Sequence, residues 1–500
     1  MARPLPLQSS FQRGMVQDLP RGDLPADSAW NMVDWIPDLG EHLRKRGGWT
    51  HALSAVGGTY VAQVGYANFL TGDKIVVVNN SGVMYTAAAS AGVTTAASAA
   101  SAVPVGKQTP YVHQNKLIVP GDGSTYPKYL DGATGAVNSL TATGLYFTAA
   151  AVYHDMSVYN NPSGVTSPNY IFFSDVSDPT VVDTTNAWLT FSTRVRAFAP
   201  LPGALLCFMD EFTARIRGSI PPGSGSDMIV DEPIFNVGCS DPGSVIVSGS
   251  YCIFANALGV YRTNGGGLPE DLTASCGVKK YWNDLLGGYS ASTWRIAGGL
   301  YRNRYFVSIT NGASFVDAFC FDPQQRTAWR LSNLPGLNFS NGIATQEELY
   351  VALRSAARVA KLSTIYVPSG TVKADADGTV IAPLLETSYY PAPVSYGRNR
   401  QAGDPLPSKK TWKAVYTDYE LTDAATDDPT LTISYLKDPD GGYTAVTPTL
   451  AENTQTVYAR RPLRFSSPGV AFKIQQTNAS ADTKVKMLAA DVHLREESRV

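Results

Sequence analysis

The chain has 500 residues, too many for one simple core, so its length predicts two or more domains or one large repeat-built domain with an appendage. A formal charge of −2 excludes both a protein that coats duplex DNA along its surface and a strongly acidic solvating protein. The 44% of apolar residues, the 44 Gly and the 32 Pro are typical of an all-β protein with many tight turns.

Residues 1–50 predict an extended N-terminal arm rather than an independent domain. No apolar run of about 7 to 15 residues is present to form a signal-peptide core, and no run of about 18 is present to form a membrane segment. We therefore expect synthesis in a cytoplasm, although a protein of this kind can leave a cell within a released particle. Five prolines interrupt any helix in the arm: Pro4, Pro6, Pro20, Pro25 and Pro37.

A basic triplet stands where the arm is expected to enter the folded region. Gly47 and Gly48 allow a sharp turn there, and Trp49 is expected to fill an apolar gap. The triplet itself is interpreted as a solvated or subunit-facing turn, with contact to an acidic neighbour or to DNA phosphate as the alternative. The candidate interface residues of the arm are Phe11, Trp30, Trp35, Arg44, Lys45 and Arg46.

A strand–turn–strand pattern recurs seven times between residues 51 and 365. A hairpin every 40 to 53 residues predicts a β-propeller of six or seven blades, with seven favoured by the count. The ring is expected to close with a strand from residues 51–66. A β-sandwich or several small β domains remain the alternative. The hairpins span 74–86, 116–132, 156–175, 204–219, 251–265, 304–322 and 348–362.

The repeat stops after about residue 365, and residues 366–500 predict a β-rich platform or sandwich domain. Trp412, Ala414, Tyr416 and Asp418 are expected on one side of the first strand, as a strand's period of two requires, although the alternation of residue types is imperfect. Five strands are expected, over 411–421, 431–436, 456–465, 470–477 and 485–494.

The arm carries an ordered series of short motifs that resembles the start of many tailed-phage structural proteins. The series runs from Phe11–Gly14 through Leu24–Met32 and the pair Ile36 and Asp38 to Leu43–Trp49. It is similar in particular to the tail hub or nozzle proteins of short-tailed phages, including the packaged-DNA stabilisation proteins. In that family an arm is followed by a β-propeller and sheet-rich platform elements.

This resemblance implies a non-enzymatic virion structural protein of the tail, made and assembled in the host bacterial cytoplasm. It implies a homo-oligomeric ring, with a hexamer favoured, that contacts the portal adaptor and other tail proteins. Double-stranded DNA would pass without sequence recognition, and near-zero net charge suits such sliding. The resemblance assigns no individual site residue.

The residues themselves predict no catalytic residue, cofactor or metal site. The five His residues lack HxxxH and HxH spacing, no GxSxG elbow or phosphate-binding loop occurs, and the five Cys lack a CxxC pair, so reduced thiols are expected.

The alternative function is a carbohydrate-binding or carbohydrate-cleaving propeller on a phage tail or cell surface. Its candidate acids are Asp175 with Asp178 and Asp210 with Glu211, because glycoside cleavage needs two carboxylates about the scissile bond.

Overall fold

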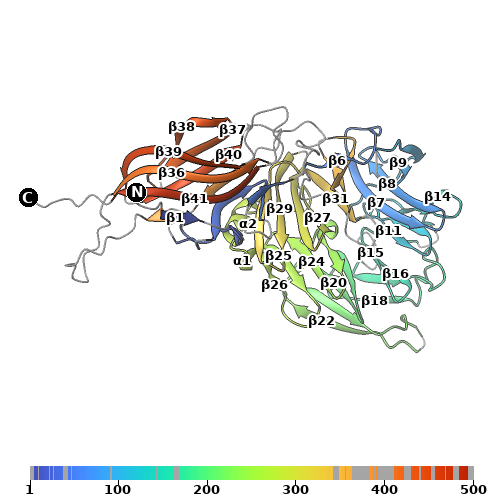
Figure 1. Ribbon diagram of the computed structural model, residues 1–500. Coiled ribbons are helices and arrows are strands. Elements are labelled where there is room, and N and C mark those ends of the chain that lie inside the picture. Colours follow the sequence, from blue (N-terminus) through green and yellow to red (C-terminus); the bar gives the residue numbers. More distant parts are fainter. Residues whose placement is uncertain are drawn as a thin grey trace, which may run out of the picture.

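In the part of the chain that the computed structural model describes, almost all of the regular secondary structure is β-strand, which confirms the all-β prediction (Figure 1). Two short helices interrupt it, α1 (Leu272–Ser275) and α2 (Lys279–Leu285), together with the 3-10 turn η2 (Pro242–Ser244). No helix in this described part is long and apolar enough to cross a membrane. The described residues are 5–8, 11–21, 23–25, 27–37, 43–46, 48–89, 93–141, 144–161, 168–223, 225–312, 314–341, 348–354, 356–362, 383–387, 390–391, 410–421, 430–438, 441–451, 456–467, 469–476 and 483–493.

Six separate four-stranded antiparallel sheets form the blades of a propeller. The first is β7 (Val61–Phe69), β8 (Gly72–Asn79), β9 (Met84–Ala88) and β10 (Ala97–Ala100), and the second is β11 (Tyr111–His113), β12 (Lys116–Val119), β13 (Lys128–Asp131) and β14 (Val137–Ser139). The third is β15 (Ala150–Tyr153), β16 (Met156–Asn160), β17 (Tyr170–Phe173) and β18 (Trp188–Thr190), and the fourth is β19 (Ala197–Leu201), β20 (Ala204–Phe208), β21 (Thr213–Arg217) and β22 (Ile229–Phe235). The fifth is β23 (Ile246–Ser248), β24 (Tyr251–Asn256), β25 (Gly259–Thr263) and β26 (Glu270–Asp271), and the last is β31 (Gly336–Asn341), β32 (Leu349–Leu353), β33 (Val359–Leu362) and β6 (Thr50–His51).

One further repeat unit lies between the fifth blade and the last, formed by β27 (Trp294–Tyr301), β28 (Arg304–Asn311), β29 (Ser314–Asp322) and β30 (Thr327–Leu331). It does not end as a blade, because β30 pairs onward with strands from the start of the chain and the sheet grows to eleven strands. The favoured count of seven blades is therefore corrected to six separate blades, and the remaining hairpin unit is merged with the platform.

Each of the seven predicted hairpins forms the second and third strands of one repeat unit. Three of the preceding turns, between first and second strands, place two consecutive residues in the left-handed region. These are Gln114–Asn115, His154–Asp155 and Arg302–Asn303. Two positive φ values in a row are those of a type I′ turn, whose twist matches the right-handed twist of the flanking strands.

The last blade is closed by the start of the chain, as the prediction required. His51 pairs with Ala360 and Thr50 with Lys361, and the Ala52 amide continues the contact by donating to the Val359 carbonyl at 2.9 Å. The closing strand, Thr50–His51, lies at the edge of the expected range of 51–66, and the end of that range, from Val61, belongs to β7 of the first blade.

The C-terminal region forms two sheets, each of which includes strands from the N-terminal residues. β36 (Lys410–Leu421), β39 (Thr456–Ser467) and β41 (Thr483–His493) pair in a sheet with β1 (Leu5–Gln8), β4 (Trp35–Pro37) and β5 (Leu43–Lys45). The eleven-stranded sheet continues from β30 through β2 (Gly14–Met15) and β3 (Ser28–Val33) to β34 (Leu384–Thr387), β40 (Gly469–Gln476), β37 (Thr430–Leu436) and β38 (Thr444–Ala451), with β35 (Tyr390–Pro391) beside β40.

All five strands predicted for this region are present, and β34, β35 and β38 were not predicted. The imperfect alternation around Trp412 has a structural cause, since the register shifts between Trp412 and Ala414 in both pairings of β36. Ala414 and Val415 are consequently both buried.

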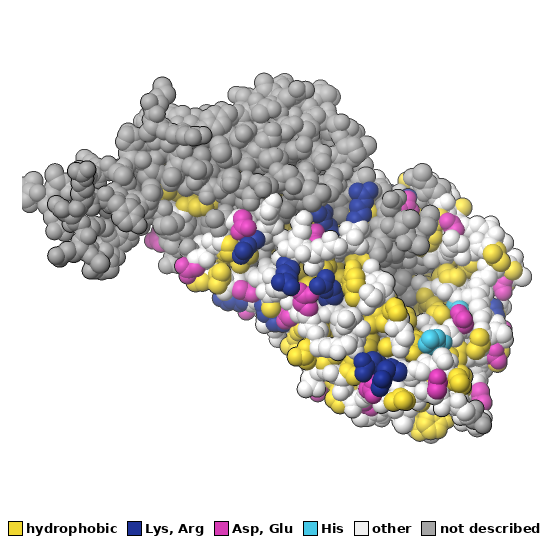
Figure 2. All heavy atoms as spheres, turned by 60° about the horizontal axis from the view of Figure 1, so that its bottom comes forward, with side chains coloured by type: hydrophobic (Ala, Val, Ile, Leu, Met, Phe, Trp, Pro, Cys, Tyr) yellow, Lys and Arg dark blue, Asp and Glu magenta, His cyan; other side chains and the backbone are white. Residues whose placement is uncertain are grey.

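One hydrophobic core runs from the propeller into the two C-terminal sheets. Trp282 and Trp329 of the propeller share it with Trp35 and Trp49 of the N-terminal residues and with Trp412 of β36. On the face of the molecule shown in Figure 2, Lys and Arg side chains are interspersed with Asp and Glu rather than gathered in one basic patch.

Candidate functional site

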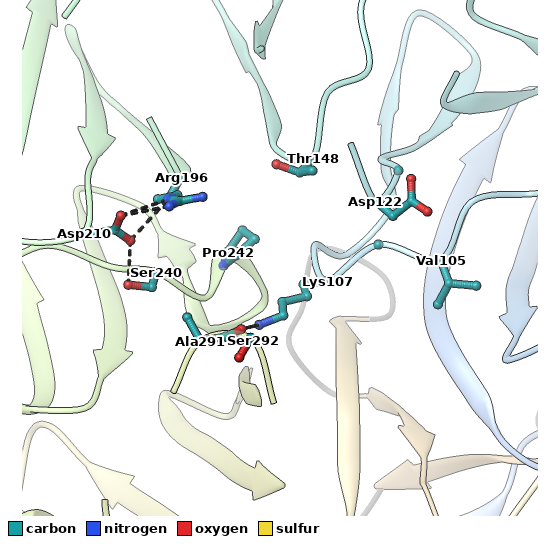
Figure 3. Close-up of a pocket in the computed structure, with 12 residues that line it drawn as sticks. Val105, Lys107, Asp122, Thr148, Arg196, Asp210, Ser240, Pro242, Ala291 and Ser292 are labelled. Carbon is teal, nitrogen blue, oxygen red and sulfur yellow. Dashed lines mark hydrogen bonds and ion pairs between the residues drawn. The ribbon is translucent and has the colours of Figure 1, made fainter. Parts of the chain in front are cut away.

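A cavity of about 450 Å³ is lined by charged and polar side chains together with apolar groups (Figure 3). Because antiparallel strands alternate in direction, the connections between successive units and those between second and third strands share one end, called here the mouth end. The remaining connections lie at the other end, called here the far end. The cavity belongs to the mouth end and is lined by Val105, Gly106, Lys107, Gly121, Asp122, Thr148, Arg196, Asp210, Ser240, Pro242, Ala291 and Ser292.

Lys107 and Asp241 form an ion pair that links the second and fifth blades. The Lys107 Nζ lies 2.9 Å from Asp241 Oδ1 and also donates to the carbonyls of Ala291 at 2.8 Å and Trp294 at 3.2 Å. Asp241 is buried and accepts a second bond from the Tyr289 hydroxyl at 2.6 Å. Burial and then this carboxylate raise the pKa of Tyr289 far above its usual range. Since three acceptors surround its ammonium group, Lys107 is a structural cross-link rather than a free cation.

Arg196 and Asp210 form a second, half-exposed ion pair on the opposite side of Pro242 (Figure 3). The Arg196 guanidinium donates to both Asp210 oxygens, with the shortest contact of 2.9 Å from Nη2 to Oδ2. The Ser240 hydroxyl adds a 2.9 Å bond to Oδ1. The Arg196 guanidinium and the Ser240 hydroxyl both line the cavity, which suits the binding of a small polar ligand.

The other predicted acids do not join Asp210 at the mouth. Asp175 and Asp178 follow β17 at the far end, where Asp178 lies 2.6 Å from Lys116 Nζ and Asp175 accepts the Ser177 amide at 2.7 Å. Such bonds hold turns in place. Glu211 is exposed beside Asp210 and does not line the cavity. The two candidate pairs of acids therefore lie at opposite ends of the propeller, and only the pair Asp210 and Glu211 is near the cavity.

The first strands of the units surround the propeller axis and are cross-linked there by buried polar side chains. Arg295 Nη2 donates to the Gly106 and Lys107 carbonyls at 3.3 and 3.0 Å, and burial lowers its pKa to about 10. Asn338 accepts the Val64 amide at 3.1 Å and donates to the Lys107 carbonyl at 3.2 Å. Deeper along the axis a second cavity of about 300 Å³ has a mainly apolar lining, a size suited to a small molecule rather than a duplex.

Three candidate interface residues of the arm are buried within this chain. Phe11 and Trp35 lie in the main core, and Arg46 places its Nε 2.6 Å from Asp34 Oδ1. Trp30 is partly exposed. For Arg44 and Lys45 only the backbone of β5 is described, which pairs with β4 and β41. In the folded chain Phe11, Trp35 and Arg46 therefore make internal contacts and do not form a surface for a partner.

Trp49 fills an apolar space as predicted, being buried in the main core, and its indole donates to the Asn333 carbonyl at 3.1 Å. The Arg21 side chain is also used within the protein, where it contacts two aromatic rings. The Arg21 guanidinium carbon lies 5.9 Å from the Trp30 ring centre and 5.3 Å from that of Tyr443, and its Nε donates to the Thr387 carbonyl.

Sequence reasoning missed Lys107, Arg196, Asp241 and Arg295. A signal was present, since each is a charged residue at or just before the first strand of a repeat unit. Aligning the units on their hairpins would have shown this recurrence. In the described part of the chain no group of three or more His, Cys, Asp or Glu side chains could hold a metal ion. All five cysteines are buried and free.

No protein-family model and no curated protein matches this chain. Among solved structures it is similar to PorZ, a surface component of the type-IX secretion system of Porphyromonas gingivalis, with 13% identity, a TM-score of 0.41 and coverage of 68% of this chain. This chain spans 43% of PorZ. The Neurospora crassa Pan2 WD40 domain matches over 64% of this chain and 98% of its own, with 10% identity and a TM-score of 0.39.

An exo-β-1,3-galactanase from Phanerochaete chrysosporium matches over 90% of this chain and all of its own length, with 9% identity and a TM-score of 0.29. Similarities of this size carry no argument about function. The propeller assignment stands on the pairing of the strands themselves.

Proposed function

We propose that this chain is a virion structural protein, a tail nozzle or hub subunit that forms part of the DNA-exit channel below the portal and adaptor of a short-tailed phage. The observation that supports this role is the continuous β-structure between propeller and platform. β30 pairs with β2 and β3, and β3 pairs through β34 with β40, so one sheet runs through both parts. A block joined in this way suits a mechanical part.

The buried contacts of the N-terminal residues support the same role. Asp34 accepts a bond from the Ser332 amide and donates its own amide to the Arg330 carbonyl, and the Trp49 indole donates to the Asn333 carbonyl, so the start of the chain is tied to the propeller at several points. A channel subunit under load needs such coupling, whereas a signalling propeller on a flexible linker does not.

The surface charge also suits this proposal. On the described part of the face in Figure 2 the two signs are interspersed and the net charge of the chain is −2, so this part of the surface forms no dense cationic field that would hold duplex phosphates during ejection. In this role the chain catalyses no reaction, and it assembles as a homo-hexameric ring in the virion tail.

The test is native mass spectrometry of the full-length protein, alone and with the portal–adaptor complex of the same phage. A hexamer, or a monomer that becomes a ring on the adaptor, supports the proposal. A monomer that ignores the adaptor contradicts it. Deletion of residues 1–42 is unsuitable as an assembly variant, because it removes β1 to β4 from both C-terminal sheets.

The mouth cavity favours a second candidate function, the binding or cleavage of a carbohydrate. Its mixture of guanidinium, carboxylate and hydroxyl groups matches the alternating donors and acceptors of a sugar. The test is binding to an array of bacterial surface polysaccharides by the wild type and by Arg196→Ala. Asp175→Asn at the far end is the control. Loss of a glycan signal in Arg196→Ala alone would support this function, and a blank array would reject it.

A further inference from the structure

Two cavities lie one after the other along the propeller axis. The cavity of about 450 Å³ at the mouth end, called here the mouth cavity, and the deeper one of about 300 Å³, called here the axial cavity, share Pro242 in their linings. Four blades contribute to both linings, because the segments that enter their first strands line the mouth cavity and the strands themselves line the axial cavity. These strands are β11, β15, β19 and β23.

The spacing of residues on two of these strands makes the lining continuous. Arg196 lines the mouth cavity, and Phe198 and Pro200, two and four residues later, line the axial cavity. In the same way Thr148 lines the mouth cavity and Val152 lines the axial cavity. Side chains separated by an even number of residues lie on the same side of a strand. One lining therefore leads from the first cavity into the second.

The axial cavity offers a ligand mainly apolar contact, because its polar side chains are bonded within the protein. Gln108 Oε1 accepts an amide of β15 at 2.6 Å, and the Thr109 hydroxyl donates to a carbonyl of β31 at 2.7 Å. The Tyr111 hydroxyl donates to the Ser157 hydroxyl at 3.3 Å. Since a polar group is costly to bury without a partner, this cavity suits the apolar part of a small molecule.

The mouth cavity offers both donors and acceptors. The Thr148 hydroxyl accepts from Asn160 Nδ2 at 3.1 Å, so its own hydrogen is left to donate to a ligand. Asp122 Oδ1 accepts three bonds from Ser124 and Thr125, and no described residue donates to Oδ2. A hydroxyl group both donates and accepts, so a ligand head with several hydroxyls matches these groups.

The charges around the mouth cavity favour a neutral head. Lys107 is paired with Asp241 and Arg196 with Asp210, at 2.9 Å in each case. An anionic head would therefore find no unpaired cation among the residues that line this cavity, and the exposed Asp122 would repel it. A cationic head would gain little from Asp122, because the attraction of an exposed charge is weak and is screened by salt.

We propose that the two cavities form one binding site for a neutral amphipathic small molecule, with its hydroxylated head in the mouth cavity and its apolar group in the axial cavity. An alkyl or aryl glycoside has this chemistry. The inference rests on the second candidate function, carbohydrate binding at the mouth cavity, and adds the requirement for an apolar group beyond the sugar. It does not depend on the nozzle role.

Calorimetric titration of the full-length protein with octyl β-glucoside, below the concentration at which this ligand forms micelles, tests the site. The comparison ligands are glucose, which lacks the apolar group, and octyl sulfate, which lacks the hydroxyls. We expect glucose to bind at least about tenfold more weakly, because it has no alkyl chain to bury. Octyl sulfate should also bind at least about tenfold more weakly, because its charge would be desolvated without a partner.

Filling the axial cavity tests the same site from the side of the protein. Val152 is half-buried and lines this cavity, so Val152→Phe and Val152→Trp place increasing bulk in it. We expect a graded loss of affinity for octyl β-glucoside, which in Val152→Trp should fall to that of glucose. The matched control is Val176→Trp, because Val176 is 51% exposed at the far end and lines neither cavity. Thermal melting checks that each variant is folded.

Equal affinities of the wild type for octyl β-glucoside and glucose would overturn this inference and leave carbohydrate binding at the mouth cavity standing. Equal affinities for octyl β-glucoside and octyl sulfate would overturn the assignment of a hydroxylated head. A loss of affinity in Val176→Trp as large as that in Val152→Trp would reject the axial cavity as the site. A protein that binds none of the three ligands overturns the inference, and the polysaccharide array decides separately on the carbohydrate candidate.

Discussion

The Arg46 guanidinium lies 2.6 Å from the Asp34 carboxylate, and the two side chains are 7% and 0% exposed. Asp34 also accepts the Ser332 amide at 3.1 Å and a bond from the Ser332 hydroxyl, so the carboxylate joins the N-terminal residues to the propeller. The Asp34 amide donates to the Arg330 carbonyl at 2.9 Å. Arg46, the one member of the basic triplet whose side chain is described, is therefore buried in an ion pair rather than solvated or facing another subunit.

Replacing Arg46 with Ala should lower the free energy of unfolding by about 3 to 5 kcal/mol, because it leaves a buried carboxylate without its cation. Urea denaturation measures the change. Arg13→Ala is the control, since Arg13 pairs with Asp27 at 3.3 Å on the surface and its loss should cost at most about 1 kcal/mol. Equal effects of the two substitutions would show that the buried ion pair contributes no more to the free energy of unfolding than the surface pair does.

Truncating Trp49 to Ala should cost about 3 to 5 kcal/mol, because the indole is buried beside the strand that closes the last blade. Trp49→Phe retains most of the ring and loses the bond to Asn333, so its cost should be nearer 1 kcal/mol. Hydrogen exchange at β33 reports the closure directly. Unchanged protection of β33 in Trp49→Ala would contradict this link.

Stability should fall below about pH 6.5 in a way that depends on His113. Burial lowers the pKa of His113 below its usual value of 6.5, and its Nδ1 lies 2.8 Å from the Ser157 hydroxyl. As the pH falls, His113 is therefore protonated in the unfolded chain before it is protonated in the folded protein. The free energy of unfolding decreases by up to about 1.4 kcal/mol per pH unit until the lower pKa of His113 in the folded protein is reached. Thermal melting between pH 7.5 and about pH 5 measures this slope.

His113→Asn should flatten part of that slope, because the amide oxygen can still accept from Ser157 but does not titrate. The control is His154→Asn, at an exposed turn position, which should leave the slope unchanged. Identical pH profiles for the two variants would show that another group is responsible.

The five thiols should resist alkylation in the folded protein at about pH 8, because the thiolate is the reactive form and burial disfavours it. Burial raises the pKa of Cys239 to about 12 and that of Cys276 to about 12. Mass spectrometry after iodoacetamide treatment should find the native protein unlabelled and the urea-denatured chain labelled at five sites. Rapid native labelling at any of them would contradict the buried placement.

Much of the strand content could be predicted because its signals are local. Each hairpin, such as that over 251–265, combines two short apolar strands with a turn, and the strands over 430–436 and 469–476 are apolar runs between turns. The position of Asp210 at the mouth was only partly foreseen. The hairpin over 204–219 that carries Asp210 in its turn was predicted, but the end of the propeller at which this turn lies depends on the order of strands within the blade.

Non-local pairings could not be predicted in the same way. β2 has only two residues, Gly14 and Met15, yet it pairs in parallel with both β3 and β30. Nothing in so short a segment specifies a partner more than 300 residues away along the sequence. The pairing arises because β30 would otherwise present unpaired backbone N–H and C=O groups at the edge of its sheet. Packing of the core places β2 beside this edge, where it pairs with those groups.

The sequence by itself determined the all-β class, the repeated hairpins, closure by the start of the chain and the exclusion of familiar catalytic motifs, because strand alternation and turn chemistry act over a few residues. Only the tertiary structure decided the merging of one repeat unit with the platform, the burial of Arg46 against Asp34 and the separation of Asp175 from Asp210 to opposite ends. These features depend on which strand edges and charged groups come together when the core packs. A buried charge is stable only when a group of opposite charge or a hydrogen-bond partner lies beside it.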